Sequence, residues 1–196
     1  MNTNPVKKTN VVYMLLVIFV PIAVIVLGGV IGYMFFRDGG TGAVVCFMCP
    51  AALAVVWWIF GPTTIWNQKK KQMMKQLDGQ GFNRNQTFYG SNQTVVVDIR
   101  QGKVALLFFW NPFEQFVLPA SRIAKAWTDD GAAGAGFLRG TSRVSFLFLV
   151  DGIKVRVNTF TSNQRWKMDD PKILEAISKA DMMIQVLDAA KQASGE

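Results

Sequence analysis

The residues best suited to chemistry in this sequence are two cysteines spaced as a C-x-x-C pair, Cys46 and Cys49. Such a pair can hold a metal ion or exchange a disulfide. The chain has no histidine and no further cysteine, so one subunit cannot complete a tetrahedral zinc site from these ligands. Because both thiols lie inside an uncharged apolar run, we interpret them as inert membrane-buried thiols, with a disulfide or a lipidated thiol as the alternatives.

The acidic residues form no recognisable catalytic pair. Adjacent aspartates occur at 129–130, before a glycine, and at 169–170, before a proline, positions that suit a turn and a helix cap. Without a nucleophile, a base or a metal site in a known spacing, we expect a protein that is not an enzyme and that uses no cofactor.

Two long apolar runs, residues 11–36 and 43–66, carry no charge and are separated by six residues. As helices they would rise roughly 39 Å and 36 Å, which exceeds the roughly 30 Å hydrocarbon core of a bilayer. We therefore predict a two-helix transmembrane hairpin over residues 11–66. A cleaved signal peptide is the alternative for the first run, but that run is too long and a second follows at once.

The net charge of +8 belongs mainly to the ends of these runs. Residues 1–76 carry a net +6 and residues 77–196 only +2, so we expect no nucleic-acid partner. Lys7 and Lys8 precede the first run. Four lysines follow the second run and are candidates for contact with anionic lipid of the bilayer: Lys69, Lys70, Lys71 and Lys75. Positive flanks at both outer ends predict a multi-pass protein of the cell inner (cytoplasmic) membrane with both termini in the cytoplasm.

Gly28 and Gly32 form a G-x-x-x-G pair in the first run. This spacing lets two helix backbones approach closely. We expect these glycines to pack against the second run, with dimerisation between chains as the alternative. Pro21 in the same run is tolerated in a membrane helix as a kink.

The patterns divide the chain into four segments. Residues 1–10 form a polar cytoplasmic tail, which we expect to be disordered or to lie on the membrane surface. The hairpin of residues 11–66 follows, then a basic helical stalk and hinge at 67–80. Residues 81–196 form the cytoplasmic domain.

Short apolar segments alternate with turn residues in the last segment, which predicts antiparallel β structure. We predict seven strands, at residues 86–90, 94–99, 104–110, 115–118, 121–129, 143–150 and 153–160. The strongest hairpin signal is Asp151-Gly152, between the last two strands.

A C-terminal helix is predicted over residues 171–193, capped by Asp169 or Asp170 and with Pro171 at its first position. Its apolar residues recur at helical spacing and should pack on the sheet. They are Ile173, Leu174, Ile177, Ala180, Ile184 and Leu187.

Seven strands followed by one helix is the element order of the pleckstrin-homology (PH) superfold. Three stretches resemble the bacterial PH-like domains found on small membrane proteins: Gly81-Phe82-Asn83, VVVDIRQGKVALL and LPASRIAKAWTDDG. The resemblance implies a membrane-anchored α+β protein, with a seven-stranded antiparallel β barrel or sandwich capped by the C-terminal helix. It also implies an interaction or assembly module. Eukaryotic PH domains often bind phosphoinositides through a basic loop between the first two strands, but the loop here, residues 90–93, has no Lys or Arg.

The stretch LLFFWNPFEQFVL, residues 106–118, is apolar on both faces of any strand it forms. Burial in the domain or against the anchor is one interpretation, and contact with a partner is the other. The candidate partner-binding residues are Phe108, Trp110, Phe113 and Phe116.

We therefore expect a membrane-tethered interaction module that binds a membrane or cytoplasmic protein or forms a homo-oligomer. Tethering raises the effective concentration of such a module at the bilayer. The alternatives are a lipid-binding module and, from a similarity in layout, an inner-membrane exclusion-type protein of a plasmid or phage.

Overall fold

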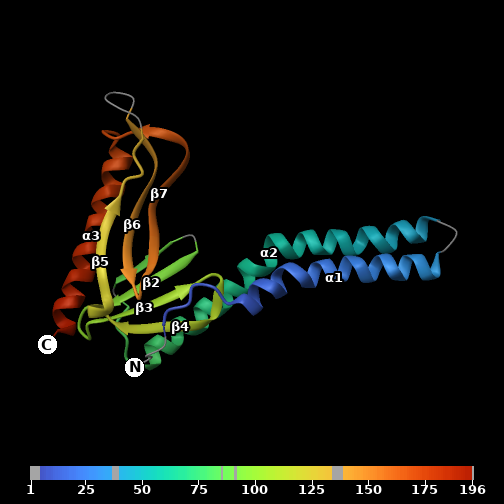
Figure 1. Cartoon of the computed structure of the whole chain (residues 1–196), viewed down its shortest axis with the longest axis horizontal. Helices are drawn as coiled ribbons and strands as arrows, with labels where there is room; N and C mark the ends of the chain where they lie inside the picture. The colour runs from blue at the N-terminus through green and yellow to red at the C-terminus, as the bar shows by residue number, and fades with distance from the viewer. Residues whose placement is uncertain (1–4, 37–39, 85, 91, 134–138, 196) are drawn as a thin grey trace. The chain divides into compact units, whose positions relative to one another are not determined.

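A computed structural model describes residues 5–36, 40–84, 86–90, 92–133 and 139–195. Within these ranges the chain forms two long helices, two antiparallel sheets of four and three strands, and a C-terminal helix, an α+β arrangement (Figure 1). The chain divides into two compact units. The helical unit comprises Lys8–Met73 and Phe109–Phe113, and the β unit comprises Met1–Lys7, Met74–Phe108 and Glu114–Glu196.

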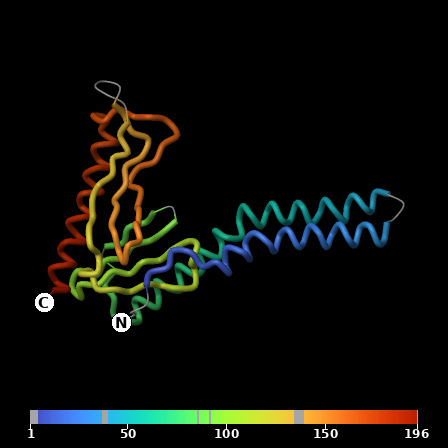
Figure 2. The backbone as a smooth tube through the Cα atoms, viewed as in Figure 1, coloured from blue at the N-terminus to red at the C-terminus, as the bar shows by residue number. Residues whose placement is uncertain are grey.

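The helical unit contains α1, Val11–Phe35, and most of α2, Thr41–Gly79, which run side by side (Figure 2). Helix α2 continues through the basic segment without a break. Most apolar side chains of both helices are exposed, unlike those of a helix in a soluble core. Both helices are long and apolar enough to cross a membrane. Of the predicted turn between them, residues 37–39 lie outside the described residues.

Proline breaks the hydrogen-bond ladder of α1, and α2 repairs it. Pro21 has no N–H for the carbonyl of Val17, four residues earlier. The indole Nε1–H of Trp58 in α2 donates to that Val17 oxygen at 3.2 Å. An unpaired carbonyl in lipid costs free energy, so this bond stabilises the chain by giving the Val17 carbonyl a donor. It also joins the two helices.

Pro50 makes the corresponding break in α2 and frees the carbonyl of Cys46. Gly28 of α1 lies against it: a Cβ on Gly28 would be 2.6 Å from the Cys46 oxygen and would overlap the Pro50 ring. A Cβ on Gly32 would be 3.1 Å from the Cys46 Cβ. The G-x-x-x-G pair therefore lies at the α1–α2 contact within one chain, where the absence of side chains permits the close approach.

Helix α2 ends in a Schellman motif. The Phe82 N–H donates to the Leu77 carbonyl at 3.0 Å, and the Gly81 N–H donates to the Asp78 carbonyl at 2.9 Å. Gly81 has φ +73°, the left-handed conformation that this motif requires. Leu77 and Phe82 are both buried, which is the apolar contact that usually accompanies the motif. These hydrogen bonds define the end of α2 at the segment predicted as a stalk and hinge, and its action as a hinge stays a prediction.

The β unit contains two sheets, ordered β1-β2-β3-β4 and β5-β6-β7. The strands are β1 Gln86–Tyr89, β2 Gln93–Asp98, β3 Lys103–Phe108, β4 Asn111–Pro119, β5 Ile123–Asp129, β6 Gly140–Val150 and β7 Ile153–Lys167. A short 3-10 turn, η1 Ala120–Arg122, separates the two sheets in the sequence. Strand β7 extends past the predicted end at residue 160, because Thr141 and Gly140 of β6 pair with Trp166 and Lys167 beyond a β-bulge.

The core of the β unit combines side chains from both sheets and from α3, Pro171–Ser194. Helix α3 packs along the three strands β5, β6 and β7 (Figure 1). Strands β2 and β3 are buried on both faces. Val95 and Leu106 face the core cluster, and their neighbours Val96 and Leu107 are also fully buried. Burial on both sides explains the continuous apolar pattern of these strands.

Helix α3 begins at the Asp170 cap, whose side chain accepts the Lys172 N–H at 2.9 Å. Its buried face differs from the predicted one. Leu174 is 53% exposed, so its assignment to the packing stripe was wrong. The buried stripe is Ile173, Ala176, Ala180, Met183, Leu187 and Ala190. Small side chains on this face let the helix lie close to the sheet, and a search for large aliphatic residues overlooks them.

The N-terminal tail was expected to be disordered or to lie on the membrane surface, and Val6 does neither. Its side chain is 2% exposed and belongs to the core cluster of the β unit. A single valine among polar residues gives no periodic signal, so only the folded core reveals its packing.

Candidate functional site

Five aromatic side chains of the helical unit gather where the apolar runs meet the lysine-rich segment. This aromatic cluster consists of Tyr13, Trp66, Phe109, Trp110 and Phe113. Tyr13 meets Phe113 edge to face at 5.5 Å between ring centroids, and Trp66 meets Phe109 at 6.0 Å. Phe109 and Trp110 are 5.1 Å apart. Each such pair contributes about 0.5–1.5 kcal/mol beyond burial, so the cluster fastens the β3–β4 turn to both helices.

Asn10 ties the same turn to the start of α1. Its backbone N–H donates to the Trp110 carbonyl at 2.8 Å, and its side chain caps α1 through the Tyr13 N–H. Asparagine ahead of an apolar run is a recognisable cap signal. The bond to Trp110 joins residues that are far apart in the sequence, and no local pattern predicts it.

Two of the four candidate lysines contact aromatic rings. The Lys69 Nζ lies 5.7 Å from the Phe113 centroid and donates to the Gln72 Oε1 at 3.2 Å. The Lys70 Nζ lies 5.6 Å from the Trp66 centroid. Lys71 and Lys75 are exposed on the same helix. Aromatic rings beside cationic side chains are typical of the headgroup level of a membrane protein, and lipid contact by these lysines stays a prediction.

The four predicted partner-binding aromatics fall into two groups. Phe108 and Phe116 pack together in the core of the β unit, with centroids 6.0 Å apart, and both are buried. Trp110 is 36% exposed and Phe113 is 53% exposed. Of the four predicted aromatics, Trp110 and Phe113 are therefore the two whose rings are accessible. Burial against the anchor was one of the two interpretations of residues 106–118, but the sequence did not indicate that Phe109 packs on Trp66 or that Phe113 packs on Tyr13.

The side chains of this site are aromatic rings and ammonium groups, which are chemically suited to non-covalent contacts. Rings and ammonium groups recognise apolar groups, headgroups and protein side chains. Among the described residues, no group of three or more His, Cys, Asp or Glu side chains is arranged to hold a metal ion. Cys46 and Cys49 are free thiols in α2.

No protein-family model, curated protein or solved structure matches the chain. Its function is therefore inferred from its own residues.

Proposed function

We propose that this protein is a non-enzymatic, membrane-tethered interaction module. Helices α1 and α2 cross the inner membrane, and both termini and the β unit lie in the cytoplasm. The partner is a membrane protein complex or a second copy of the chain.

The observation that carries this proposal is the exposed part of the aromatic cluster. Trp110 and Phe113 are partly exposed although three other rings hold their turn in place. A rigid aromatic surface loses little conformational entropy on binding, and large aromatic rings dominate protein interfaces. The cluster follows directly on the apolar run of α2, so a partner that reaches it must itself lie at the membrane surface.

The β unit is proposed to be PH-like. Its support is the order of seven strands in antiparallel sheets of four and three, followed by α3. Residues 90–92, between β1 and β2, and Gln93, the first residue of β2, supply no basic side chain for a phosphorylated headgroup, which favours a protein partner for this domain.

The topology is tested by a reporter fused after residue 196. A reporter that works in the cytoplasm is expected to be active there, because lysines flank the outer ends of both apolar runs. Activity of a periplasm-specific reporter at the same position would refute the cytoplasmic placement.

The partner is tested by placing a photocrosslinking phenylalanine analogue at position 113 of the full chain in native membranes. Position 89 serves as control, because Tyr89 is an exposed ring of the β unit outside the cluster. We expect a protein adduct of defined mass from position 113 but not from position 89, and its loss when Trp110 is replaced by serine. An adduct of twice the chain mass identifies a second copy. Adducts with lipid alone would refute the interaction module and favour a lipid-binding one.

A further inference from the structure

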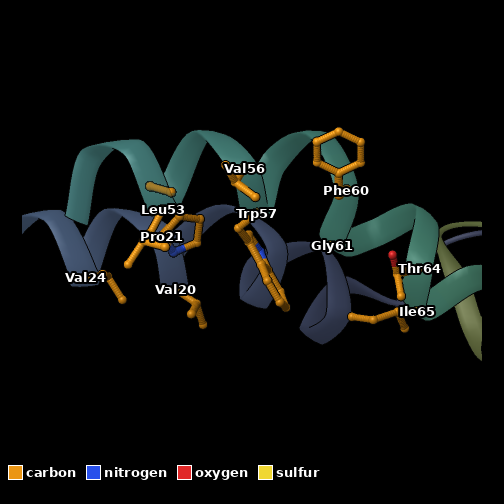
Figure 3. A pocket seen from close by; sticks show the side chains of 11 residues that line it. Val20, Pro21, Val24, Leu53, Val56, Trp57, Phe60, Gly61, Thr64 and Ile65 are labelled. Atoms are coloured by element: carbon orange, nitrogen blue, oxygen red, sulfur yellow. The ribbon is translucent and has the colours of Figure 1, made fainter. Parts of the chain in front are cut away.

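An apolar groove of about 560 Å³ lies within the helical unit, between α1 and α2 (Figure 3). Val20, Pro21 and Val24 line it from α1, and residues from Leu53 to Ile65 line it from α2. The indole of Trp57 projects from α2 toward α1 and forms one wall (Figure 3). Apart from Thr64, the lining side chains are apolar or aromatic.

Gly61 makes room for this wall. A Cβ on Gly61 would lie 2.8 Å from Cδ2 of the Trp57 indole, closer than packed atoms allow. The glycine thus lets the indole lie along the helix surface. Val20 and Val56 at the groove remain 43% and 52% exposed, so the groove opens sideways to the surroundings of the helices.

The groove occupies the depth of one bilayer leaflet. Leu53 lies at the centre of the apolar run 43–66, and Ile65 lies at its lysine end. The distance between them along α2 is about 18 Å, close to the roughly 15 Å half-thickness of a hydrocarbon core. Helix α1 lines only the part of the groove nearest the centre of the bilayer, because Val20, Pro21 and Val24 lie within about 6 Å of one another near the middle of the run 11–36.

The length and lining of the groove suit a hydrocarbon chain. Its volume of about 560 Å³ is bounded almost wholly by apolar side chains, and its lining extends about 18 Å along α2. An extended acyl chain matches both properties, because it is apolar along its length and spans about half of the roughly 30 Å hydrocarbon core.

Positive charge lies beyond the interfacial end of the groove. Lys69 follows Ile65 by one helical turn, and Lys71 follows Thr64 by two turns, on the side of α2 that lines the groove. Lys71 is exposed and Lys69 is half-buried. A molecule that matches both features has an acyl chain one leaflet long and an anionic headgroup.

We propose that this groove binds one acyl chain of an anionic phospholipid, with its phosphate at Lys69 and Lys71. The inference rests on the membrane insertion in the proposed function. The groove shares no lining residue with the partner surface at Trp110 and Phe113, although Lys69 also lies beside the Phe113 ring. Bound lipid would fill the space between the helices that their own side chains leave open.

The test uses the full chain in detergent, titrated with phosphatidylglycerol or phosphatidylcholine and observed by native mass spectrometry. We expect the wild-type chain to retain one phosphatidylglycerol at least tenfold more tightly than phosphatidylcholine. Val24→Trp and Val20→Trp fill the groove and should each weaken this binding at least tenfold. Val26→Trp is the matched control, because Val26 is 58% exposed at almost the same depth and does not line the groove. The double variant Lys69→Gln/Lys71→Gln should retain the two lipids equally.

Equal retention of both lipids by the wild-type chain, or unchanged retention by both groove-filling variants, would overturn the proposal. A wild-type dimer that is lost in Val24→Trp, with no lipid retained, would assign the groove to a second copy instead. Far-ultraviolet circular dichroism of each variant shows that its helices have formed. Extraction of the chain from membranes by alkaline carbonate would contradict membrane insertion itself, and so separates failure of the proposed function from failure of the lipid site.

Discussion

Replacing Trp58 by phenylalanine tests whether its indole N–H repairs the break that Pro21 makes in α1. The wild-type bond joins the Trp58 Nε1 to the Val17 oxygen at 3.2 Å. Without it, this carbonyl has neither the indole donor nor the N–H that a residue other than proline would supply at position 21. Interhelical hydrogen bonds in membranes average about 0.6 kcal/mol and reach about 1.7. We expect Trp58→Phe to lower the free energy of separating the helices by about 1.5 kcal/mol, near the upper value, because an unsatisfied buried acceptor costs about 1–3 kcal/mol.

The same substitution should cost less in the Pro21→Ala background. Alanine at position 21 restores the N–H for the Val17 carbonyl, so the indole bond becomes redundant. The smaller ring of phenylalanine loses the same packing in both backgrounds, and a double-mutant cycle cancels that loss. We expect a coupling of about 1 kcal/mol, the order of one net hydrogen bond. The adjacent change Trp57→Phe is the control, because the Trp57 Nε1 is buried with no hydrogen-bond partner among the described residues.

The assay is unfolding of the full chain in mixed micelles as the fraction of dodecyl sulfate rises, followed by energy transfer between a dye on α1 and a dye on α2. The free energy of separating the helices should fall for Trp58→Phe and change little or rise for Trp57→Phe. An equal cost of Trp58→Phe in the wild-type and Pro21→Ala backgrounds would refute the inference that the Trp58 indole replaces the backbone donor that Pro21 lacks.

In each of three further pairs of matched substitutions, the two variants are expected to differ in stability. Gly28→Ala should destabilise the helix pair by about 1–3 kcal/mol in the same assay, as overpacking does, whereas Gly29→Ala should be tolerated because its Cβ would come no closer than 3.8 Å to Phe47. Gly81→Ala should lower the free energy of unfolding, measured by thermal denaturation, by about 1 kcal/mol, because φ is +73° at this position. Gly79→Ala, with nothing within 4 Å of its Cβ, should be neutral or stabilising. Ile173→Ala should cost the β unit about 2–5 kcal/mol in chemical denaturation, and Leu174→Ala less than about 0.5 kcal/mol. Equal effects within any pair would contradict the packing on which it is based.

The elements that the sequence predicted well are those with a local physical signal. The apolar runs specify two helices, and Asp151-Gly152 specifies the turn between β6 and β7. The cap at Asp170 followed from a polar side chain before a proline. Contacts between distant residues carried no such signal. Val6 joins a core and Asn10 bonds to Trp110 only because the fold brings them together.

The candidate site was predicted in composition but not in arrangement. The candidate aromatics lie close together in the sequence, which indicated either burial or binding. Alternation along a strand does not determine which of these side chains are buried and which are exposed. The fold separates them: Phe108 and Phe116 enter the core, and Trp110 and Phe113 remain accessible. Exposure of a ring depends on what packs over it, which is a property of tertiary structure.

The proline breaks at Pro21 and Pro50 limit how copies of this chain can associate. The Val17 carbonyl freed by Pro21 is bound by Trp58 near the lysine end of the hairpin, and the Cys46 carbonyl freed by Pro50 lies against Gly28 nearer the other end. Each helix therefore covers a backbone defect of the other at two depths, which fixes the register of α1 against α2. Because this pairing already occupies Gly28 and Gly32, a dimer formed through the G-x-x-x-G pair would have to displace α2 from Gly28 and uncover the Cys46 carbonyl. Self-association, if it is the function, is expected instead at Trp110 and Phe113 or on the lipid-facing sides of the helices, and Gly28→Ala should destabilise the monomer without selectively abolishing a dimer adduct from position 113.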